Sequence, residues 1–118
     1  MCLSDFDEAA NADEADTANI VDTLAEIRRR VGAAAEARAL AERALRGAPS
    51  GAHVGARVVR GAFRATLAKA LLDAGDGDRA RAERDEALAL LEGTSAQASR
   101  IARELRRQFE AAVSGAPT

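Results

Sequence analysis

The sequence predicts an all-α fold of about five helices, arranged as antiparallel helical hairpins. Three observations support this class. Strong helix formers dominate the composition, whereas Trp and Tyr are absent and aromatic residues make up only 3% of the chain. Large apolar residues recur three and four positions apart, as on one side of a helix. Gly and Pro then separate these periodic segments, as expected between helices.

The chain of 118 residues fits one small domain with a modest core. We expect an acidic, disordered head over 1–16, a helical domain over 17–113 and a loose tail over 114–118. No apolar run reaches 18 residues, and no signal-peptide core follows the first Met. The expectation is therefore a cytoplasmic chain with no membrane partner.

The first helix is expected at about 17–31, with Asp16 or Thr17 as its cap and Gly32 as its stop. Its expected apolar stripe comprises Ile20, Val21, Leu24, Ile27 and Val31. The second helix is expected at 34–46, before Gly47 and Pro49. Its apolar face comprises Ala37, Leu40, Ala41, Ala44 and Leu45.

The third helix is expected to run from about Ser50 to Ala74, with glycines that weaken its start or permit close helix contact. Its expected buried side comprises Val54, Val58, Val59, Phe63, Leu67, Ala70, Leu71 and Ala74. The fourth helix is expected at 77–92, capped by Asp76 or Asp78, and the fifth at 95–113, opened by Thr94 or Ser95. Their apolar positions are Ala80, Ala87, Leu88, Leu90 and Leu91, then Ile101, Leu105, Phe109 and Val113.

Nothing in the sequence predicts a catalytic or metal site. His53 is the only histidine and Cys2 the only cysteine, so a transition-metal site and a catalytic triad lack their usual residues. We expect His53 to be a surface or cap residue. Asp73, Asp76 and Asp78 resemble a calcium loop, but Arg84 occupies the twelfth position, where an EF-hand needs Glu. These residues predict a turn between helices and no cofactor.

The charges are unevenly distributed along the chain. Residues 1–27 carry eight of the 19 acidic residues and none of the 17 basic ones. The last helix carries a group of arginines that would suit an acidic partner, nucleic acid or the acidic head itself: Arg100, Arg103, Arg106 and Arg107. No aromatic residues alternate with them to stack on bases, which makes nucleic acid the less favoured partner.

One pattern of spacing occurs twice. Ala25 is followed by Gly32, Ala37 and Ala44-Leu45, and Ala68 is followed at the same intervals by Gly75, Ala80 and Ala87-Leu88. Small residues at these positions would let paired helices approach closely, and Gly would turn the chain between them. Ile101-Ala102 lies 34 residues after Leu67-Ala68 and extends the pattern into the last helix.

This spacing resembles the tetratricopeptide repeat. Residues 18–51 and 61–94 are similar to two repeats, and 95–113 to the capping helix. The copies lie 43 residues apart, Glu92 replaces the expected Pro, and the usual aromatic positions are filled by Val21, Arg28, Ala41, Arg64, Leu71 and Arg84. The resemblance implies a short right-handed array whose first, third and fifth helices line a concave groove. Two repeats form a small array, so a homodimer or a docked partner would add stability.

The resemblance therefore implies a non-enzymatic protein-interaction module, an adaptor or regulator that binds a protein or peptide. The implied groove residues are Asp22, Glu26, Arg29, Arg30, Lys69, Leu72, Asp73, Arg103 and Arg106. They do not reproduce the family's two-carboxylate clamp, so a chaperone tail is not implied. Two alternatives remain open: a DNA-binding regulator that uses the arginine-rich helix, and a non-catalytic accessory subunit of an enzyme complex.

Overall fold

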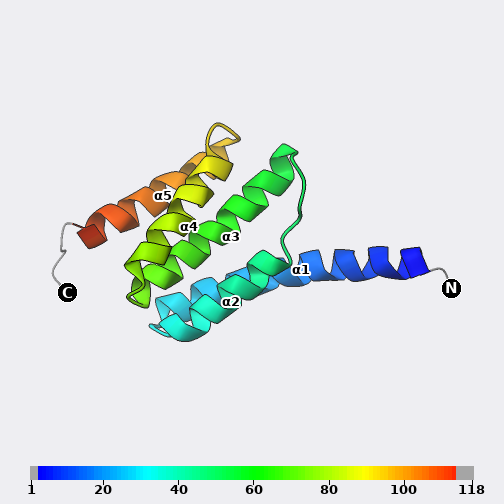
Figure 1. The fold of residues 1–118 in the computed structure, drawn as a ribbon, viewed down its shortest axis with the longest axis horizontal. Coiled ribbons are helices and arrows are strands. Elements are labelled where there is room, and N and C mark those ends of the chain that lie inside the picture. The colour runs from blue at the N-terminus through cyan, green and yellow to red at the C-terminus, as the bar shows by residue number, and fades with distance from the viewer. Residues whose placement is uncertain (1–2, 114–118) are drawn as a thin grey trace.

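A computed structural model describes the backbone of residues 3–113 and the side chains of residues 17–112. The predicted all-α class is confirmed, because the described backbone forms five helices and no strand. In chain order they are α1 (Leu3–Arg30), α2 (Ala34–Arg46), α3 (Val54–Asp73), α4 (Gly77–Leu91) and α5 (Ala96–Val113). Helices α1 and α2 form one antiparallel hairpin, α3 and α4 form a second, and α5 follows them (Figure 1). None of the described helices is long and apolar enough to cross a membrane.

The two hairpins turn through the same backbone motif. Gly32 and Gly75 have φ values of 85° and 86°, in the left-handed region that favours glycine. In the first turn the N–H of Ala33 donates to the carbonyl of Arg28, and the N–H of Gly32 donates to that of Arg29. The second turn repeats both bonds 43 residues later. This is the Schellman arrangement, and it explains why Gly32 and Gly75 predicted the ends of α1 and α3 to within one residue.

Side-chain caps set the starts of the later helices. The ring Nδ1 of His53 accepts the backbone N–H of Ala56 at 3.2 Å, so the prediction of a cap residue is confirmed. Asp76 caps α4 through the N–H of Arg79, and Ser95 accepts the N–H of Ala98 at the start of α5. Asp76 therefore has the role of a turn and cap residue.

The third helix begins later than predicted. The sequence predicts a start near Ser50, but α3 begins at Val54, immediately after the His53 cap. The Arg60 guanidinium donates to the carbonyls of Pro49, at 3.0 Å, and Gly51, at 2.7 Å. These bonds stabilise the preceding segment in a non-helical conformation, and Gly51 adds little helical preference.

The first helix begins earlier than predicted. It starts at Leu3, whereas the apolar periodicity predicts a start near residue 17. No Gly or Pro interrupts 3–30, so nothing in the sequence stops the helix at that point. The first part of α1 extends beyond the end of α2 (Figure 1). A separate, disordered acidic head over 1–16 stays a prediction, and the predicted tail over 114–118 lies outside the described residues.

Small residues form the contacts between the helices of each hairpin. Six alanines at equivalent positions of the two hairpins have no exposed surface: Ala25, Ala37 and Ala44 in the first, and Ala68, Ala80 and Ala87 in the second. A methyl side chain lets two helix backbones approach more closely than Leu or Ile would. Larger side chains fill the centre around them, chiefly Leu67, Leu71, Leu105 and Phe109.

The predicted buried face of α1 is wrong. The buried residues are Ala18, Val21 and Ala25, and of the expected stripe only Val21 belongs to them. The other four predicted residues remain solvent-exposed: Ile20 (63%), Leu24 (40%), Ile27 (47%) and Val31 (69%). Two sides of α1 carry apolar residues at helical spacing. Close packing on α2 and α3 selects the side with the smaller residues, although the other side is more hydrophobic.

The remaining core assignments hold with local exceptions. The predicted alanines of α2 are buried, while Leu40 and Leu45 pack at the edge of the core. Most of the predicted side of α3 is buried or partly buried, but Val54 is 53% exposed and Ala74 is exposed. Val54 is the first residue of α3, and Ala74 is the residue that follows its end. The Val113 side chain lies outside the described residues.

Gly61 marks the closest approach of α3 to α4. A Cβ atom built there would lie 2.7 Å from Cγ and 2.8 Å from Cδ2 of Leu91. The prediction that a glycine of this helix permits close contact is therefore confirmed at Gly61. Gly55 differs, because a Cβ there would meet only the ring of His53, at 3.4 Å.

We predict that Gly61→Ala destabilises the protein, because overpacking costs about 1–3 kcal/mol and exceeds the gain in helix propensity. Gly55→Ala is the matched control in the same helix. It should leave the free energy of unfolding unchanged or raise it by up to about 1 kcal/mol. Urea unfolding of both variants measures the difference, and equal stability of the two would contradict the close contact.

Candidate functional site

Five of the predicted groove residues lie together where α1 meets α3. Lys69 Nζ lies 3.0 Å from Glu26 Oε1, and Arg29 Nη1 lies 3.3 Å from Asp73 Oδ2. Arg29 Nε lies 3.5 Å from Glu26 Oε1 and joins these two pairs into one α1–α3 ion-pair network. The Lys69 and Arg29 side chains are only 11% and 13% exposed. The network therefore connects the two hairpins through largely buried charges, which are costly to leave unpaired.

Asp22, the fifth residue, lies one helical turn before Glu26. Burial raises the pKa of Asp22 from 3.8 to about 6; Thr66 opposes this by hydrogen bonding, Glu26 adds to it and Lys69 opposes it. Burial also raises the pKa of Glu26, but Lys69 and Arg29 outweigh burial and hold that pKa below its ordinary value. Neighbouring carboxyls with opposite shifts occur in acid–base catalysis. Here both contact the other hairpin, so their shifts report the packing of α1 on α3.

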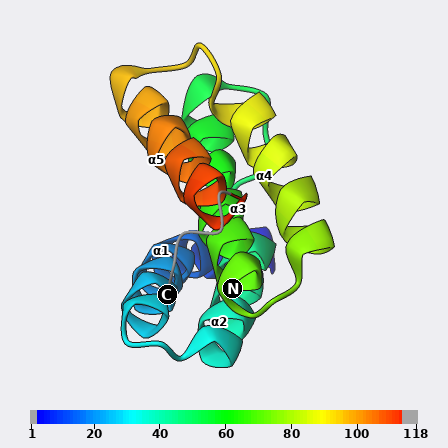
Figure 2. The ribbon, with the colours of Figure 1, turned by 90° about the vertical axis from the view of Figure 1, so that its left-hand side faces the viewer.

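The other four predicted groove residues remain outside this network. Leu72 is half-buried and packs against the core. Arg30, Arg103 and Arg106 are exposed, and none forms an ion pair with a described residue. Helices α1 and α5 both contact α3 but not each other within the described residues, and Figure 2 shows them on the same side of α3. The predicted groove residues thus lie on α1, α3 and α5, but the sequence did not predict that four of the nine pair with one another.

All four arginines of α5 are free of ion pairs with described residues. Arg100, Arg103, Arg106 and Arg107 are exposed, in contrast to Arg64, which lies 2.7 Å from Glu83. Arg84 lies over the ring of Phe109, 5.0 Å from its centroid, and so connects α4 to α5 by a cation–π contact. The four arginines of α5 outweigh the exposed Glu104 and Glu110, so α5 carries a net charge of +2.

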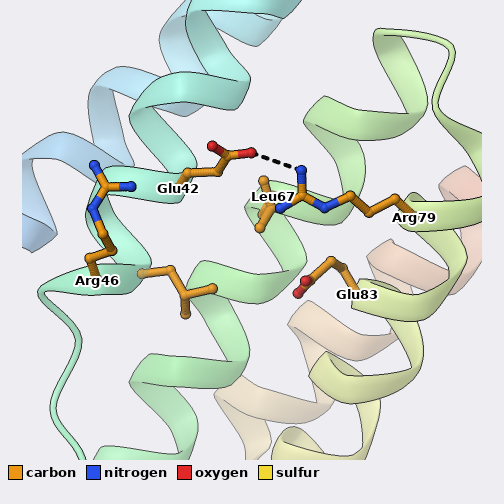
Figure 3. Close-up of a pocket in the computed structure, with 6 residues that line it drawn as sticks. Glu42, Arg46, Leu67, Arg79 and Glu83 are labelled. Atoms are coloured by element: carbon orange, nitrogen blue, oxygen red, sulfur yellow. Dashed lines mark hydrogen bonds and ion pairs between the residues drawn. The ribbon is translucent and has the colours of Figure 1, made fainter.

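A hollow of about 330 Å³ lies between α2, α3 and α4, away from the predicted groove. It is lined by Glu42, Leu45, Arg46, Leu67, Arg79 and Glu83. Arg79 Nη1 donates to Glu42 Oε1 at 3.0 Å and joins α4 to α2 across its opening (Figure 3). The sequence offers no signal for this hollow, because its walls come from residues far apart in the chain and without a shared motif.

The described side chains include no cluster of metal-ligating groups. No group of three or more His, Cys, Asp or Glu residues within them could hold a metal ion. His53 uses its ring nitrogen to cap α3. Comparison of the chain with family models, curated proteins and solved structures finds no match in any of the three.

We predict that Asp22→Asn stabilises the protein at neutral pH. The folded state holds the Asp22 proton to about pH 6, whereas the unfolded chain releases it near 3.8. Rising pH across this window therefore destabilises the folded protein through Asp22. Urea unfolding at about pH 4 and about pH 7.5 should show the variant gaining on the wild type at the higher pH, by about 1–3 kcal/mol.

Glu26→Gln is the matched control, and its stability relative to the wild type should change with pH in the opposite direction. The folded state of the wild type favours the Glu26 carboxylate, so this variant should lose stability relative to the wild type as pH rises. A stability difference for Asp22→Asn that does not change with pH would contradict the burial of that carboxyl.

Proposed function

We propose that this chain is a small protein-interaction module, an adaptor or regulatory accessory protein of the cytoplasm, that binds an acidic segment of a protein or peptide. This proposal rests on which of the predicted groove residues form ion pairs with one another and which do not. Glu26, Arg29, Lys69 and Asp73 neutralise one another. Four charged groove residues have no ion pair to a described residue; Asp22 is half-buried where α1 meets α3, and the three that are exposed are cations, namely Arg30, Arg103 and Arg106.

The arginines of α5 supply the chemistry of recognition. Guanidinium groups bind carboxylates through paired hydrogen bonds, and unpaired exposed groups can do so without first breaking an internal ion pair. Arg103 and Arg106 lie one helical turn apart, so two acidic residues of a partner could contact them together. Such binding needs no cofactor and no chemical step.

The repeated hairpin supports the same function. Both copies use a left-handed Gly at the turn and fully buried alanines at equivalent positions. This organisation is similar to tetratricopeptide repeats, which bind partners along one side of a helical array. In the proposed arrangement the partner lies along the surface that α1, α3 and α5 share, and an enzyme subunit is one partner of this kind.

A DNA-binding regulator is the second candidate, because exposed arginines also contact phosphates. The two candidates differ in their salt dependence, since each phosphate contact releases counterions. A labelled DNA duplex therefore serves as a probe. Binding that falls steeply as salt rises would favour the DNA-binding candidate, and negligible binding at low salt would exclude it.

We predict that the double substitution Arg103→Glu and Arg106→Glu weakens the protein complex by at least about tenfold, because attraction to an acidic segment becomes repulsion. The partner is first captured from the native host and identified, and its affinity is then measured by calorimetry with purified components. Circular dichroism checks that the variant remains helical.

The control is the double substitution Arg43→Glu and Arg46→Glu on α2. These arginines are also exposed, three positions apart and without an ion pair to a described residue. They should leave the affinity unchanged. If α2 substitutions weaken binding and α5 substitutions do not, the proposed surface is wrong.

A further inference from the structure

An apolar stripe runs along the solvent side of α1. It consists of Ile20, Leu24 and Ile27 of α1 and of Val31, the residue that follows the helix, all between 40% and 69% exposed. Ala18, Val21 and Ala25 occupy the other side, which packs on the rest of the molecule. Within the described residues α1 contacts only α2 and α3. Large aliphatic residues gathered into one exposed stripe are typical of a surface that another molecule covers.

The spacing of the stripe makes it complementary to itself. Its residues are separated by four, three and four positions, so the pattern reads the same in both directions. Two antiparallel copies related by a two-fold axis would place Ile20 opposite Val31 of the other copy, and Leu24 opposite its Ile27. This alternation of three and four is the seam pattern of paired helices. A two-fold axis requires such self-complementarity of a surface.

The order of charges along α1 also favours an antiparallel arrangement of the two copies. Residues 1–27 carry eight acidic residues and no basic one, and Arg28, Arg29 and Arg30 follow at once. Two parallel copies would bring acids against acids and arginines against arginines. Two antiparallel copies bring the acidic part of each helix towards Arg30 of the other, whereas Arg28 and Arg29 already pair within their own chain, with Glu36 and with Glu26 and Asp73. Arg30 is exposed and forms no ion pair with a described residue, so it is free for this role.

We propose that the stripe of α1 is covered by α1 of a second copy of this chain, in an antiparallel arrangement that makes the protein a two-fold symmetric homodimer. The dimer and the partner-binding proposal share Arg30 but fail separately, because the α5 arginines take no part in the dimer and the apolar stripe takes no part in partner binding. In the register set by the stripe, residues 20–31 of the two copies lie side by side over about 18 Å.

Analytical ultracentrifugation from micromolar to millimolar concentration tests the assembly. The wild type should reach twice its chain mass of 12.3 kDa. Ile20→Glu should raise the dissociation constant at least about tenfold, because it places a charge in the apolar seam. Leu24→Glu is a second variant with the same expected effect. Circular dichroism checks that both retain their helices.

Val54→Glu is the matched control, since Val54 is an aliphatic residue of similar exposure on α3, outside the stripe. It should dimerise like the wild type. A wild type that stays monomeric at millimolar concentration overturns the proposal. A dimer that Ile20→Glu and Leu24→Glu leave intact overturns the assignment of the stripe.

Disulfide cross-linking tests the direction in chains that also carry Cys2→Ser. In an antiparallel pair, Ile20→Cys chains should cross-link to Val31→Cys chains when the two are mixed, and neither should cross-link when alone. Cross-linking of each variant with itself, and not with the other, would overturn the antiparallel arrangement.

Discussion

The close approach of paired helices across alanine is the constraint on which the rest of this structure depends. In each hairpin three alanines are fully buried at equivalent positions, and a left-handed glycine closes the turn that brings the two helices together. In the α3–α4 hairpin the helices come closest at Gly61, where even the methyl group of alanine would collide with Leu91. The larger buried residues Leu67, Leu71, Leu105 and Phe109, from α3 and α5, cluster with four of these alanines in the core.

The properties of the surface follow from this constraint. Because α1 packs through Ala18, Val21 and Ala25, its larger aliphatic residues face solvent and form the stripe that we propose a second copy covers. The same orientation turns Glu26 and Arg29 towards α3, where they pair with Lys69 and Asp73. Glu26 and Asp73 are thereby paired, while the arginines of α5 remain without an ion pair to a described residue. The orientation of α1 thus leaves an apolar surface on α1 and a separate cationic surface on α5.

The sequence alone predicted the fold correctly wherever a single residue determines the local backbone conformation. Gly32, Gly75 and Asp76 predicted the turns and the bounds of α2 and α4 closely, because a left-handed turn and an N-terminal cap each require particular residue types. The prediction failed where two sides of one helix both carry apolar residues at helical spacing, so that either could be the buried side. Ile20 and Ala18 both belong to regular stripes, and a ranking by hydrophobicity selects the larger residues, whereas packing distance selects the smaller. Pairs such as Glu42 with Arg79 depend on how the hairpins meet, and no local motif encodes that contact.

The most direct test is the free energy of unfolding of Ala25→Leu, measured by urea denaturation against Ala89→Leu, an exposed position of α4. If α1 packs through its alanine side, a larger residue at Ala25 must push the helices apart. The substitution should then cost about 1–3 kcal/mol or more, while Ala89→Leu changes the stability by less than about 0.5 kcal/mol. Equal stability of the two variants would contradict the account, because α1 would then pack through the Ile20, Leu24, Ile27 and Val31 stripe instead.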